Sequence, residues 1–247
     1  PVIVAHDADI KLAAEYALWS AMANAGQSCI GAERVYVVES VADEFIETIV
    51  DLAKKIRPGQ SYGPATMPSQ LNVIQSHLDD AKAKGAKFLL GGPDSVKGAF
   101  VEPVIMVDVP EDSLAMTDET FGPTLAINKV MNTDEAIKLS NASSYGLAAA
   151  VFSKREGEKI AAKLACGMVS INSVFLFAAI AAVPFGGVKD SGYGRIHGAE
   201  GLLEYTYARS VVKTRFKIPL RFTTFKRTKL SEKILTLLIK KLHGRKK

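Results

Sequence analysis

The sequence predicts an α/β fold, with a mostly parallel sheet that carries helices on both faces. Strand and helix patterns alternate along the chain, which favours parallel strands joined by helical crossovers. One stretch, Ala148–Phe152 followed by a helical pattern over 154–165 and then Met168–Asn172, has the order of a βαβ unit. With 247 residues, 48% of them hydrophobic, the chain can bury a substantial core.

The first elements are predicted from their periodicity. Val2–Ala5 is a short apolar strand, and Ala8–Ala23 is a helix because its apolar residues recur at helical spacing, with Asp7 as the expected N-cap. Arg34–Val38 is rich in β-branched and aromatic residues, which favours a strand. Val41–Ile56 again has one apolar helical face.

The middle of the chain is punctuated by Pro and Gly. A loop over 57–68 precedes a helix at Gln70–Lys84 and a short strand at Phe88–Leu90, which ends in a Gly-Gly pair. Two further strands are predicted at Val101–Val107 and Thr124–Val130.

After these strands the pattern continues with shorter elements. A helix is predicted at Thr133–Ser140 with Thr133 as its cap, and the βαβ unit described above follows. A Gly-rich loop then covers 184–195, and a helix at 198–205 leads to an edge strand at Ser210–Phe216.

Charge is distributed unevenly. Residues 209–247 contain 14 Lys and Arg but one acid, Glu232, for a net charge of +13; since the whole chain carries +5, residues 1–208 carry −8. Leu230–Leu242 has an apolar helical stripe between lysines and is predicted as an amphipathic helix. Such a helix is a candidate for peripheral contact with an anionic membrane; docking on a neighbouring subunit and a solvated end are the alternatives.

Several classes of protein are disfavoured by composition. Cys29 and Cys166 are far apart and the four histidines do not cluster with them, so neither a disulfide framework nor a metal site is expected. No base-reading motif accompanies the basic tail, so nucleic acid is not an expected partner. Because the sequence shows no secretory leader and no apolar run of about 18 residues, a cytoplasmic protein is predicted. Pro1 follows no initiator Met, which indicates a chain cut from a longer protein.

Three short motifs carry the strongest functional signal. They are Asn-Ala-Gly-Gln-Ser-Cys at 24–29, Glu-Thr-Phe-Gly-Pro at 119–123 and Pro-Phe-Gly-Gly-Val-Lys-Asp-Ser-Gly at 184–192. In this order and at this wide spacing they resemble the aldehyde dehydrogenase superfamily, over nearly all of residues 1–216. We therefore divide the chain into a catalytic domain at 1–208, an oligomerisation strand at 209–218 that resembles the family's, and the basic tail at 219–247.

Cys29 is the candidate nucleophile. A thiolate adds to an aldehyde carbonyl, the thiohemiacetal loses a hydride to a nicotinamide, and water hydrolyses the resulting thioester. Gly26 and Ser28 are small neighbours that leave the thiol accessible. A small buried cysteine after a helix is the alternative interpretation. Cys166, which precedes a strand in Leu-Ala-Cys-Gly, is expected to be a buried packing thiol.

The resemblance implies roles around the cofactor, NAD or NADP. Glu119 resembles the carboxylate that accepts hydrogen bonds from the nicotinamide ribose, and Phe121 resembles the ring that packs near the nicotinamide. Gln70 resembles a weaker ribose contact, with an ordinary surface helix residue as its alternative. Asn172 resembles a family asparagine that is structural more often than catalytic.

The substrate side is indicated by aromatic residues. Phe185 resembles the pocket aromatic beside the thiol, and Phe177 lies in an uncharged stretch, 175–183, in the region that shapes the family's substrate tunnel. The lack of charge favours an apolar or aromatic aldehyde over a carboxylated one; packing at a subunit interface is the alternative. The glycines over 186–194 do not match a phosphate-binding loop and are expected to let this loop pass close to the catalytic turn.

Parts of the family pattern are not found in the sequence. The family's dinucleotide-binding domain, which makes most of the cofactor contacts, its general-base glutamate and its oxyanion asparagine all precede the region that resembles this chain. We therefore expect an NAD(P)-dependent parent enzyme that is a homo-oligomer, a dimer or a tetramer, and an isolated chain that does not turn over. A non-catalytic relative acting as an oligomerisation or binding module, and a cysteine hydrolase without nicotinamide, are the alternatives. Both water and coenzyme A are open as the acyl acceptor.

Overall fold

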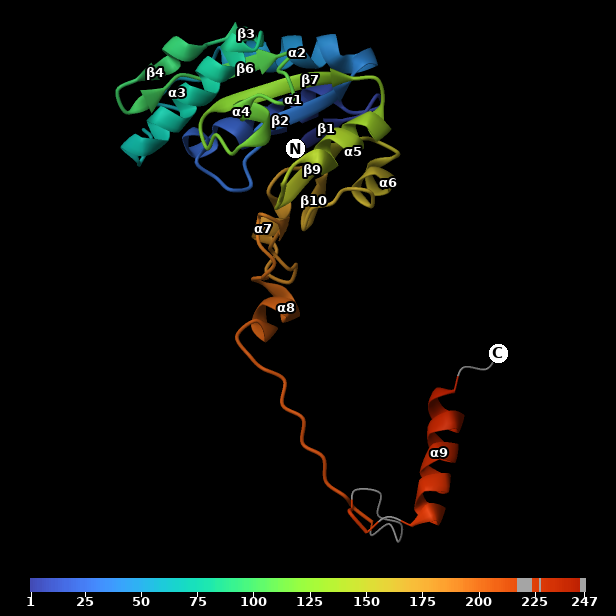
Figure 1. Cartoon of the computed structure of the whole chain (residues 1–247). Helices are drawn as coiled ribbons and strands as arrows, with labels where there is room; N and C mark the ends of the chain where they lie inside the picture. The colour runs from blue at the N-terminus through green and yellow to red at the C-terminus, as the bar shows by residue number, and fades with distance from the viewer. Residues whose placement is uncertain (217–223, 227, 245–247) are drawn as a thin grey trace. The chain divides into compact units, whose positions relative to one another are not determined.

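The computed structural model describes residues 1–216, 224–226 and 228–244, which fall into two units. The first unit, Pro1–Thr206, contains a seven-stranded sheet in the order β10-β9-β1-β2-β7-β6-β3 (Figure 1). All neighbouring strands pair in parallel except β3, which runs antiparallel to β6. Two small antiparallel ladders, β4 with β5 and β8 with β11, lie outside this sheet.

The strands are β1 (Val2–Val4), β2 (Arg34–Val38), β3 (Lys87–Leu90), β4 (Val96–Lys97), β5 (Phe100–Val101), β6 (Val104–Val107), β7 (Thr124–Val130), β8 (Tyr145–Gly146), β9 (Ala148–Phe152), β10 (Met168–Ile171) and β11 (Val188–Lys189). The α-helices are α1 (Ile10–Met22), α2 (Glu39–Ala53), α3 (Pro68–Ala83), α4 (Leu114–Thr117), α5 (Thr133–Ala142), α6 (Gly157–Ala161), α7 (Leu176–Ala179), α8 (Gly198–Leu203) and α9 (Lys229–His243). Short 3₁₀ turns cover Ala23–Gly26 and Pro93–Ser95.

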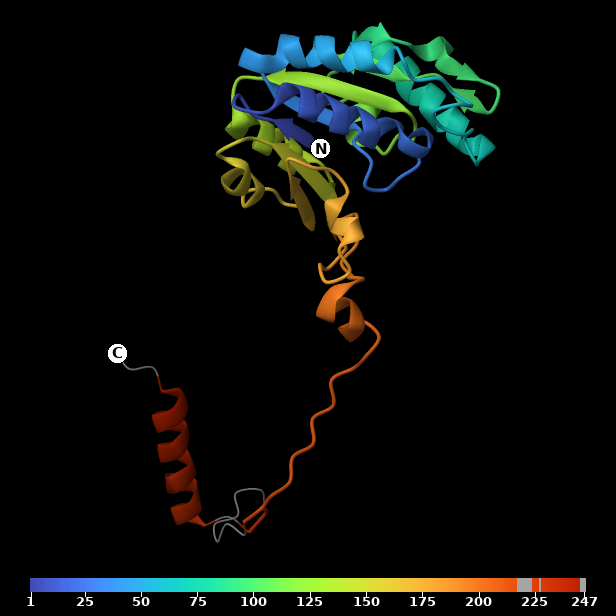
Figure 2. The same cartoon turned by 180° about the vertical axis from the view of Figure 1, so that it is seen from behind.

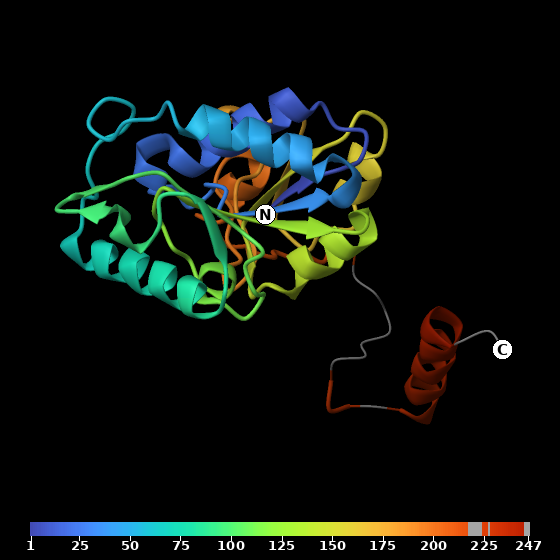
Figure 3. The ribbon, with the colours of Figure 1, turned by 90° about the horizontal axis from the view of Figure 1, so that it is seen from above.

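Different helices cover the two faces of the sheet. Val2 and Val4 of β1 pack with the apolar residues of α1 and α2, whereas Ile3 packs with those of α3 and α5. Figure 2 shows α1 and α2 in front of the sheet, and Figure 3 shows them (blue) on one side of the strands, with α3 (teal) and α5 (yellow-green) on the other. Successive strand side chains point to opposite faces, so both faces are buried. The predicted α/β fold, with a mostly parallel sheet and helices on both faces, is confirmed.

Side-chain caps move the ends of two predicted helices. Asp9, not Asp7, caps α1, because the Asp9 carboxylate accepts a hydrogen bond from the backbone N–H three residues later (3.2 Å). Asp7 instead accepts hydrogen bonds from the Ser153 hydroxyl (2.7 Å) and from the backbone N–H of Arg155 (3.0 Å). Ser153 also accepts from the backbone N–H of Glu156. These bonds hold the chain outside the helix, so α6 begins at Gly157, and the helix predicted over 154–165 is reduced to α6.

Three further predictions differ from the structure in local detail. The cap of α5 is Asn132, whose side chain accepts from the third helical N–H at 3.0 Å, while Thr133 is the first helical residue. The strand predicted over Val101–Val107 is divided at Pro103, which has no N–H to give to a ladder. The stretch 175–183, predicted as a loop, contains the short helix α7.

The second unit, Tyr207–Lys247, contains α9. Residues 207–216 are exposed and have no strand partner within the described part of the chain, so the predicted strand Ser210–Phe216 is not formed inside one chain, and its pairing across a subunit interface stays a prediction. The predicted tail helix is confirmed as α9, which Thr228 caps reciprocally with Ser231 (3.2 and 3.0 Å). No described helix is long and apolar enough to cross a membrane. Residues 217–223, 227 and 245–247, which include the end of the predicted oligomerisation strand and part of the basic tail, lie outside the described residues.

Candidate active site

Cys29 follows a turn with an unusual backbone. Residues 24–26 all have left-handed φ, at 54°, 58° and 71°. The Gln27 side chain holds this turn, because its amide donates to the carbonyls of Asn24 (2.9 Å) and Pro64 (3.3 Å). Its carbonyl oxygen accepts from both the N–H and the hydroxyl of Thr66 (2.8 and 2.9 Å). The loop predicted over 57–68 therefore supports the turn that presents the cysteine.

The same turn lies directly against the second motif. A Cβ placed on Gly26 would stand 2.1 Å from the carbonyl oxygen of Gly122 and 2.9 Å from the nitrogen of Pro123. Such distances are far below any real contact, so the two backbones approach in a way that Gly26 alone permits. The sequence predicted small residues here for access to the thiol; their larger effect is to join two motifs that are far apart in the chain.

The motif at 119–123 is fixed by side chains from α3 and from Glu33, the residue before β2. The two Glu33 carboxylate oxygens accept from the backbone N–H groups of Thr120 (3.1 Å) and Phe121 (2.8 Å). Gln70 on α3 donates to the Thr120 carbonyl (2.6 Å), and the His77 ring lies 3.0 Å from the Thr120 hydroxyl. Burial lowers the pKa of His77, so the neutral ring is favoured in this contact.

Arg34 completes these contacts. Its guanidinium donates to the carbonyl of Asp118 (2.9 Å) and to the Ser143 hydroxyl (3.2 Å), and it lies 4.0 Å from the Glu33 carboxylate. The residue is buried, and its Nε has no partner among the described residues. Sequence analysis did not identify Glu33 and Arg34 as site residues. The signal that could have identified them is a charged pair that opens an apolar strand shortly after the candidate nucleophile.

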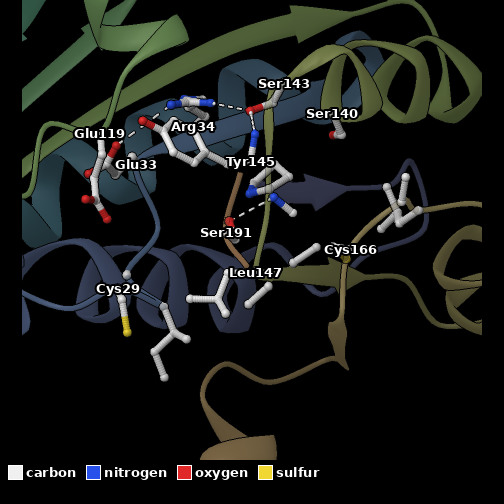
Figure 4. A pocket seen from close by; sticks show the side chains of 18 of the residues that line it. Cys29, Glu33, Arg34, Glu119, Ser140, Ser143, Tyr145, Leu147, Cys166 and Ser191 are labelled. Carbon is white, nitrogen blue, oxygen red and sulfur yellow. Dashed lines mark hydrogen bonds and ion pairs between the residues drawn. The ribbon is translucent and has the colours of Figure 1, made fainter. Parts of the chain in front are cut away.

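Cys29 and Glu119 line one cavity of about 300 Å³. In the close-up of Figure 4, the two carboxylates of Glu33 and Glu119 lie side by side near Arg34, and the Cys29 sulfur points away from them. The Cys29 side chain is exposed, and within the described residues its thiol makes no hydrogen bond. Further walls of the cavity come from the start of the chain, from α5, from the segment between α5 and β9, from Cys166 and from Ser191.

Glu119 has the environment of a free acceptor. Its carboxylate accepts no hydrogen bond from the described residues, and its pKa is raised by partial desolvation and by the negative charge of Glu33, with Arg34 acting in the opposite direction. Phe121, in left-handed backbone at φ 51°, is partly buried beside it. A carboxylate without other partners suits the hydroxyl groups of a ribose, whereas neither Phe121 nor Gln70 is among the residues that line the cavity.

Cys166 is half-buried rather than buried, which corrects the prediction of a packing thiol in the core. Its thiol donates to the carbonyl of Met168 (3.3 Å), and burial raises its pKa. It lines the same cavity as Cys29, and the raised pKa keeps it mainly in the unreactive thiol form near neutral pH. Asn172 has the expected structural role, because its side-chain amide exchanges two hydrogen bonds with the Ser153 backbone (3.0 and 2.9 Å).

The two predicted substrate aromatics pack against each other. The ring centres of Phe177 and Phe185 are 6.2 Å apart, and those of Phe185 and His197 are 6.0 Å apart. Phe177 also lines a small second cavity with Ile30 and Gly31, the two residues that follow Cys29. Phe185 lines neither cavity and reaches this region through Phe177.

The Gly-rich loop differs from its prediction. A Cβ on Gly186 would meet the carbonyl of Gly194 at 2.3 Å, and a Cβ on Gly167 would meet the carbonyl of Gly186 at 1.9 Å. These glycines let the loop fold on itself and against the segment before β10, not against the catalytic turn. The close approach to that turn is made by Gly122 instead. Among the described residues, no group of three or more His, Cys, Asp or Glu side chains could hold a metal ion.

Comparison with known proteins gives a consistent answer. A model of the "Aldehyde dehydrogenase family" matches residues 1–211. The chain is 39% identical to the "Putative succinate-semialdehyde dehydrogenase [NADP(+)]" of Mycolicibacterium smegmatis, covering 87% of this chain and 44% of that protein. It is 38% identical to the 4,4'-diapolycopene aldehyde oxidase of a Methylomonas species, covering 88% and 42%. The chain thus spans less than half the length of these curated relatives.

Solved structures agree with the sequence matches. The "Putative Aldehyde Dehydrogenase PutA" from Anabaena variabilis superposes with a TM-score of 0.83 at 33% identity, covering 90% of this chain and 50% of that one. The betaine aldehyde dehydrogenase of Staphylococcus aureus in complex with NAD+ superposes with a TM-score of 0.80 at 34% identity, covering 90% and 46%.

Proposed function

The chain belongs to the aldehyde dehydrogenase family, and on that premise we propose that it is the nucleophile-bearing half of an NAD(P)-dependent enzyme that oxidises an aldehyde to a carboxylic acid. The observation that carries the proposal is that Cys29 and Glu119, which lie in different motifs, line one cavity of about 300 Å³. A thiol and a free carboxylate acceptor are the two groups that this chemistry needs from the catalytic half.

The proposed reaction at Cys29 has three steps. The thiolate forms a C–S bond to the aldehyde carbon, and the carbonyl oxygen becomes the oxygen of a thiohemiacetal. Loss of a hydride from that carbon restores the C=O bond and leaves a thioester. Water then attacks the thioester, releasing the acid and the thiol. When bound, the oxidised nicotinamide supplies the hydride acceptor.

Three residues of this chain would hold the cofactor. Glu119 has no other hydrogen-bond partner among the described residues, so its carboxylate is available to ribose hydroxyls. Phe121 offers an aromatic ring beside it. Gln70 uses its amide on Thr120, so we propose that it acts mainly by holding the loop, with its side-chain oxygen left to accept a further bond. NAD and NADP both suit these contacts, and most of the cofactor contacts are proposed to come from residues outside this chain.

We propose that the preferred aldehyde is apolar or aromatic. The stretch 175–183 carries no charge, and its Phe177 lies beside the residues that follow Cys29. A carboxylated aldehyde would need a cation near its far end. A kcat/KM for octanal or benzaldehyde at least about tenfold above that for succinate semialdehyde would support this preference, and the reverse order would contradict it.

A preparation of these 247 residues alone is expected not to turn over. The Cys29 thiol has no basic partner among the described residues, and Glu33, the carboxylate nearest in sequence, is engaged by the loop at 120–121. Deprotonation of the thiol and of the attacking water therefore lacks an assigned base among the described residues of this chain.

Assembly and location are part of the proposal. We expect a homo-oligomer, dimer or tetramer, built in part through the segment at 209–218, whose alternating sequence suits strand addition and whose described residues, 209–216, are exposed. A cytoplasmic protein is expected, with α9 in peripheral contact with an anionic membrane. None of the residues of α9 is buried, and Lys229, Lys233 and Lys240 occupy its polar side.

A second function is a non-catalytic oligomerisation or binding module. The exposed segment at 207–216, which has no strand partner among the described residues, favours it, because such an edge is suited to strand addition. The two functions are separable: a module would oligomerise through 209–218 whether or not Cys29 is present.

Matched cysteine variants test the proposal. In the protein that carries this chain, Cys29→Ala should lower aldehyde-dependent NAD(P)H formation by at least about a thousandfold, because the covalent path is lost. Cys166→Ala, which removes the other thiol of the same cavity, should retain most of the activity. Equal activity of Cys29→Ala and the unmodified protein would refute the assigned nucleophile, and oligomerisation without any oxidation would favour the module.

A further inference from the structure

We infer that Glu33, together with Arg34, is a positioning residue that clamps the segment 118–121 and so sets where Glu119 and Phe121 stand relative to Cys29. The inference rests on the proposed function for its kinetic consequences, but its structural part stands on the contacts alone. Neither residue touches the reacting atoms in this role; both act through the loop.

The clamp holds the backbone on both sides of Glu119. Before it, the Asp118 carbonyl accepts from the Arg34 guanidinium at 2.9 Å. After it, the N–H groups of Thr120 and Phe121 donate to the two oxygens of Glu33 at 3.1 and 2.8 Å. Because all three bonds involve a charged partner, they are stronger than neutral hydrogen bonds. Glu119 lies between these bonds, and its own side chain is left available for a ligand.

The surroundings make these bonds effective. The Glu33 side chain is 18% exposed and that of Arg34 is 10% exposed, so water competes weakly for either group. The guanidinium lies 4.0 Å from the carboxylate and partly offsets its charge. Phe121 has left-handed backbone at φ 51°, a conformation that costs free energy for a residue with a Cβ. A bond to its N–H is therefore placed where the backbone most needs support.

The clamp also shares a short segment with the nucleophile. Glu33 comes four residues after Cys29, and the next residue begins strand β2, which is paired on both edges. Ser20 on α1 anchors the intervening chain by accepting from the Ala32 N–H at 3.0 Å. Cys29 and the carboxylate that holds the loop thus move together, and Glu33 links nucleophile position to loop position.

The first test is Glu33→Gln in the protein that carries this chain. Glutamine keeps the size, but one of its two terminal atoms is an NH₂ group facing an N–H donor, so one bond is lost and the other becomes neutral. We expect the KM for NAD(P) to rise on the order of tenfold. The rate of p-nitrophenyl acetate hydrolysis without cofactor should stay within about twofold. The esterase reaction uses Cys29, whereas cofactor binding uses the loop at 118–121. Glu33→Asp, which restores the charge, should recover part of the KM.

Glu111→Gln is the matched control. Glu111 is also a carboxylate that accepts two side-chain bonds at the sheet, from Tyr36 (2.8 Å) and Asn128 (2.9 Å), but it does not contact the loop. Its substitution should change the KM for NAD(P) by less than about twofold even if both variants lose similar thermal stability.

Amide hydrogen exchange provides a readout that does not depend on activity. The peptide containing 118–121 should exchange faster in Glu33→Gln than in the unmodified protein and in Glu111→Gln, because two N–H groups lose a charged acceptor. Unchanged exchange would overturn the clamp. Faster exchange with an unchanged KM for NAD(P) would overturn the positioning role and leave Glu33 a structural residue. Faster exchange with an esterase rate that falls as much as the KM rises would do the same. If the unmodified protein oxidises no aldehyde, the proposed function fails, and the exchange result alone decides the clamp.

Discussion

Replacement of Gly26 by alanine should separate the two motifs that form the site. The new Cβ would lie 2.1 Å from the Gly122 oxygen, 2.3 Å from its carbon and 2.9 Å from the Pro123 nitrogen. Since real Cβ atoms keep 3.0 Å or more, the backbones must part by about 0.9 Å. Backbone atoms cannot rotate away as a side chain does, so the whole turn or the whole loop must move.

The magnitude has two contributions. Left-handed backbone at φ 71° costs a residue with a Cβ about 1–2 kcal/mol, and overpacking of a close contact costs about 1–3 kcal/mol more. Gly26→Ala should therefore lower the free energy of unfolding by about 2–5 kcal/mol. Gly98→Ala is the matched control, because Gly98 has φ 62° but no atom within 4 Å of the position that a Cβ would take, so it should lose only the first contribution.

Urea denaturation followed by circular dichroism measures both variants. Alkylation of Cys29 by iodoacetamide, mapped by mass spectrometry, reports the turn itself and should change in Gly26→Ala but not in Gly98→Ala. Equal losses of stability in the two variants, with Cys29 reactivity unchanged in both, would refute the inferred backbone contact.

Four other predictions test separate features. Asp80→Asn should lower stability by on the order of 1 kcal/mol at pH 7, since Asp80 caps the start of α4. Hydrogen bonds from α4 depress the pKa of Asp80, so its contribution is complete above about pH 4 and is lost as the pH falls further; urea unfolding at pH 7 and pH 3 checks this, and an equal loss at both would contradict it. Iodoacetamide should label Cys29 faster than Cys166 near pH 7, because Cys29 is exposed whereas Cys166 is half-buried and burial raises its pKa; equal rates at pH 7 would argue against it. Phe177→Ala should reduce kcat/KM for octanal by about tenfold but that for acetaldehyde by much less, as steady-state kinetics would report. Deleting 219–247 should abolish co-sedimentation with phosphatidylserine vesicles and leave aldehyde oxidation intact; sedimentation that survives the deletion would remove the membrane role of the tail.

Much of the fold could be predicted because the central strands are buried on both faces. Arg34–Val38, Thr124–Val130 and Ala148–Phe152 have the predicted bounds, since continuous apolar segments leave little choice of register or length. Helix ends were less predictable. The sequence analysis predicted Asp7 as the N-cap of α1, whereas Asp9 caps the helix in the structure, because Ser153 from a distant part of the chain binds Asp7.

The site was predictable in its motifs and not in its supports. Cys29 and Glu119 were both selected from the sequence, and they line one cavity. The bonds that hold the loop run from Glu33 to backbone N–H groups, and a backbone group has the same appearance in every sequence. Only the folded chain reveals which carboxylate it reaches. The tail strand at 210–216 differs for another reason: a strand needs a neighbouring strand, and the described part of the chain supplies none.

The left-handed turn before Cys29 sets an order of events during synthesis. Its supports, Pro64 and Thr66 on one side and Gly122 on the other, are synthesised about forty and nearly one hundred residues later. Local preference alone does not hold residues 24–26 in that conformation, because each of the first two carries a Cβ. The nascent chain thus displays an ordinary cysteine until β7 is available to pair with β2. The reactivity proposed for Cys29 would therefore be acquired late, after β2 and β7 have paired at the centre of the sheet.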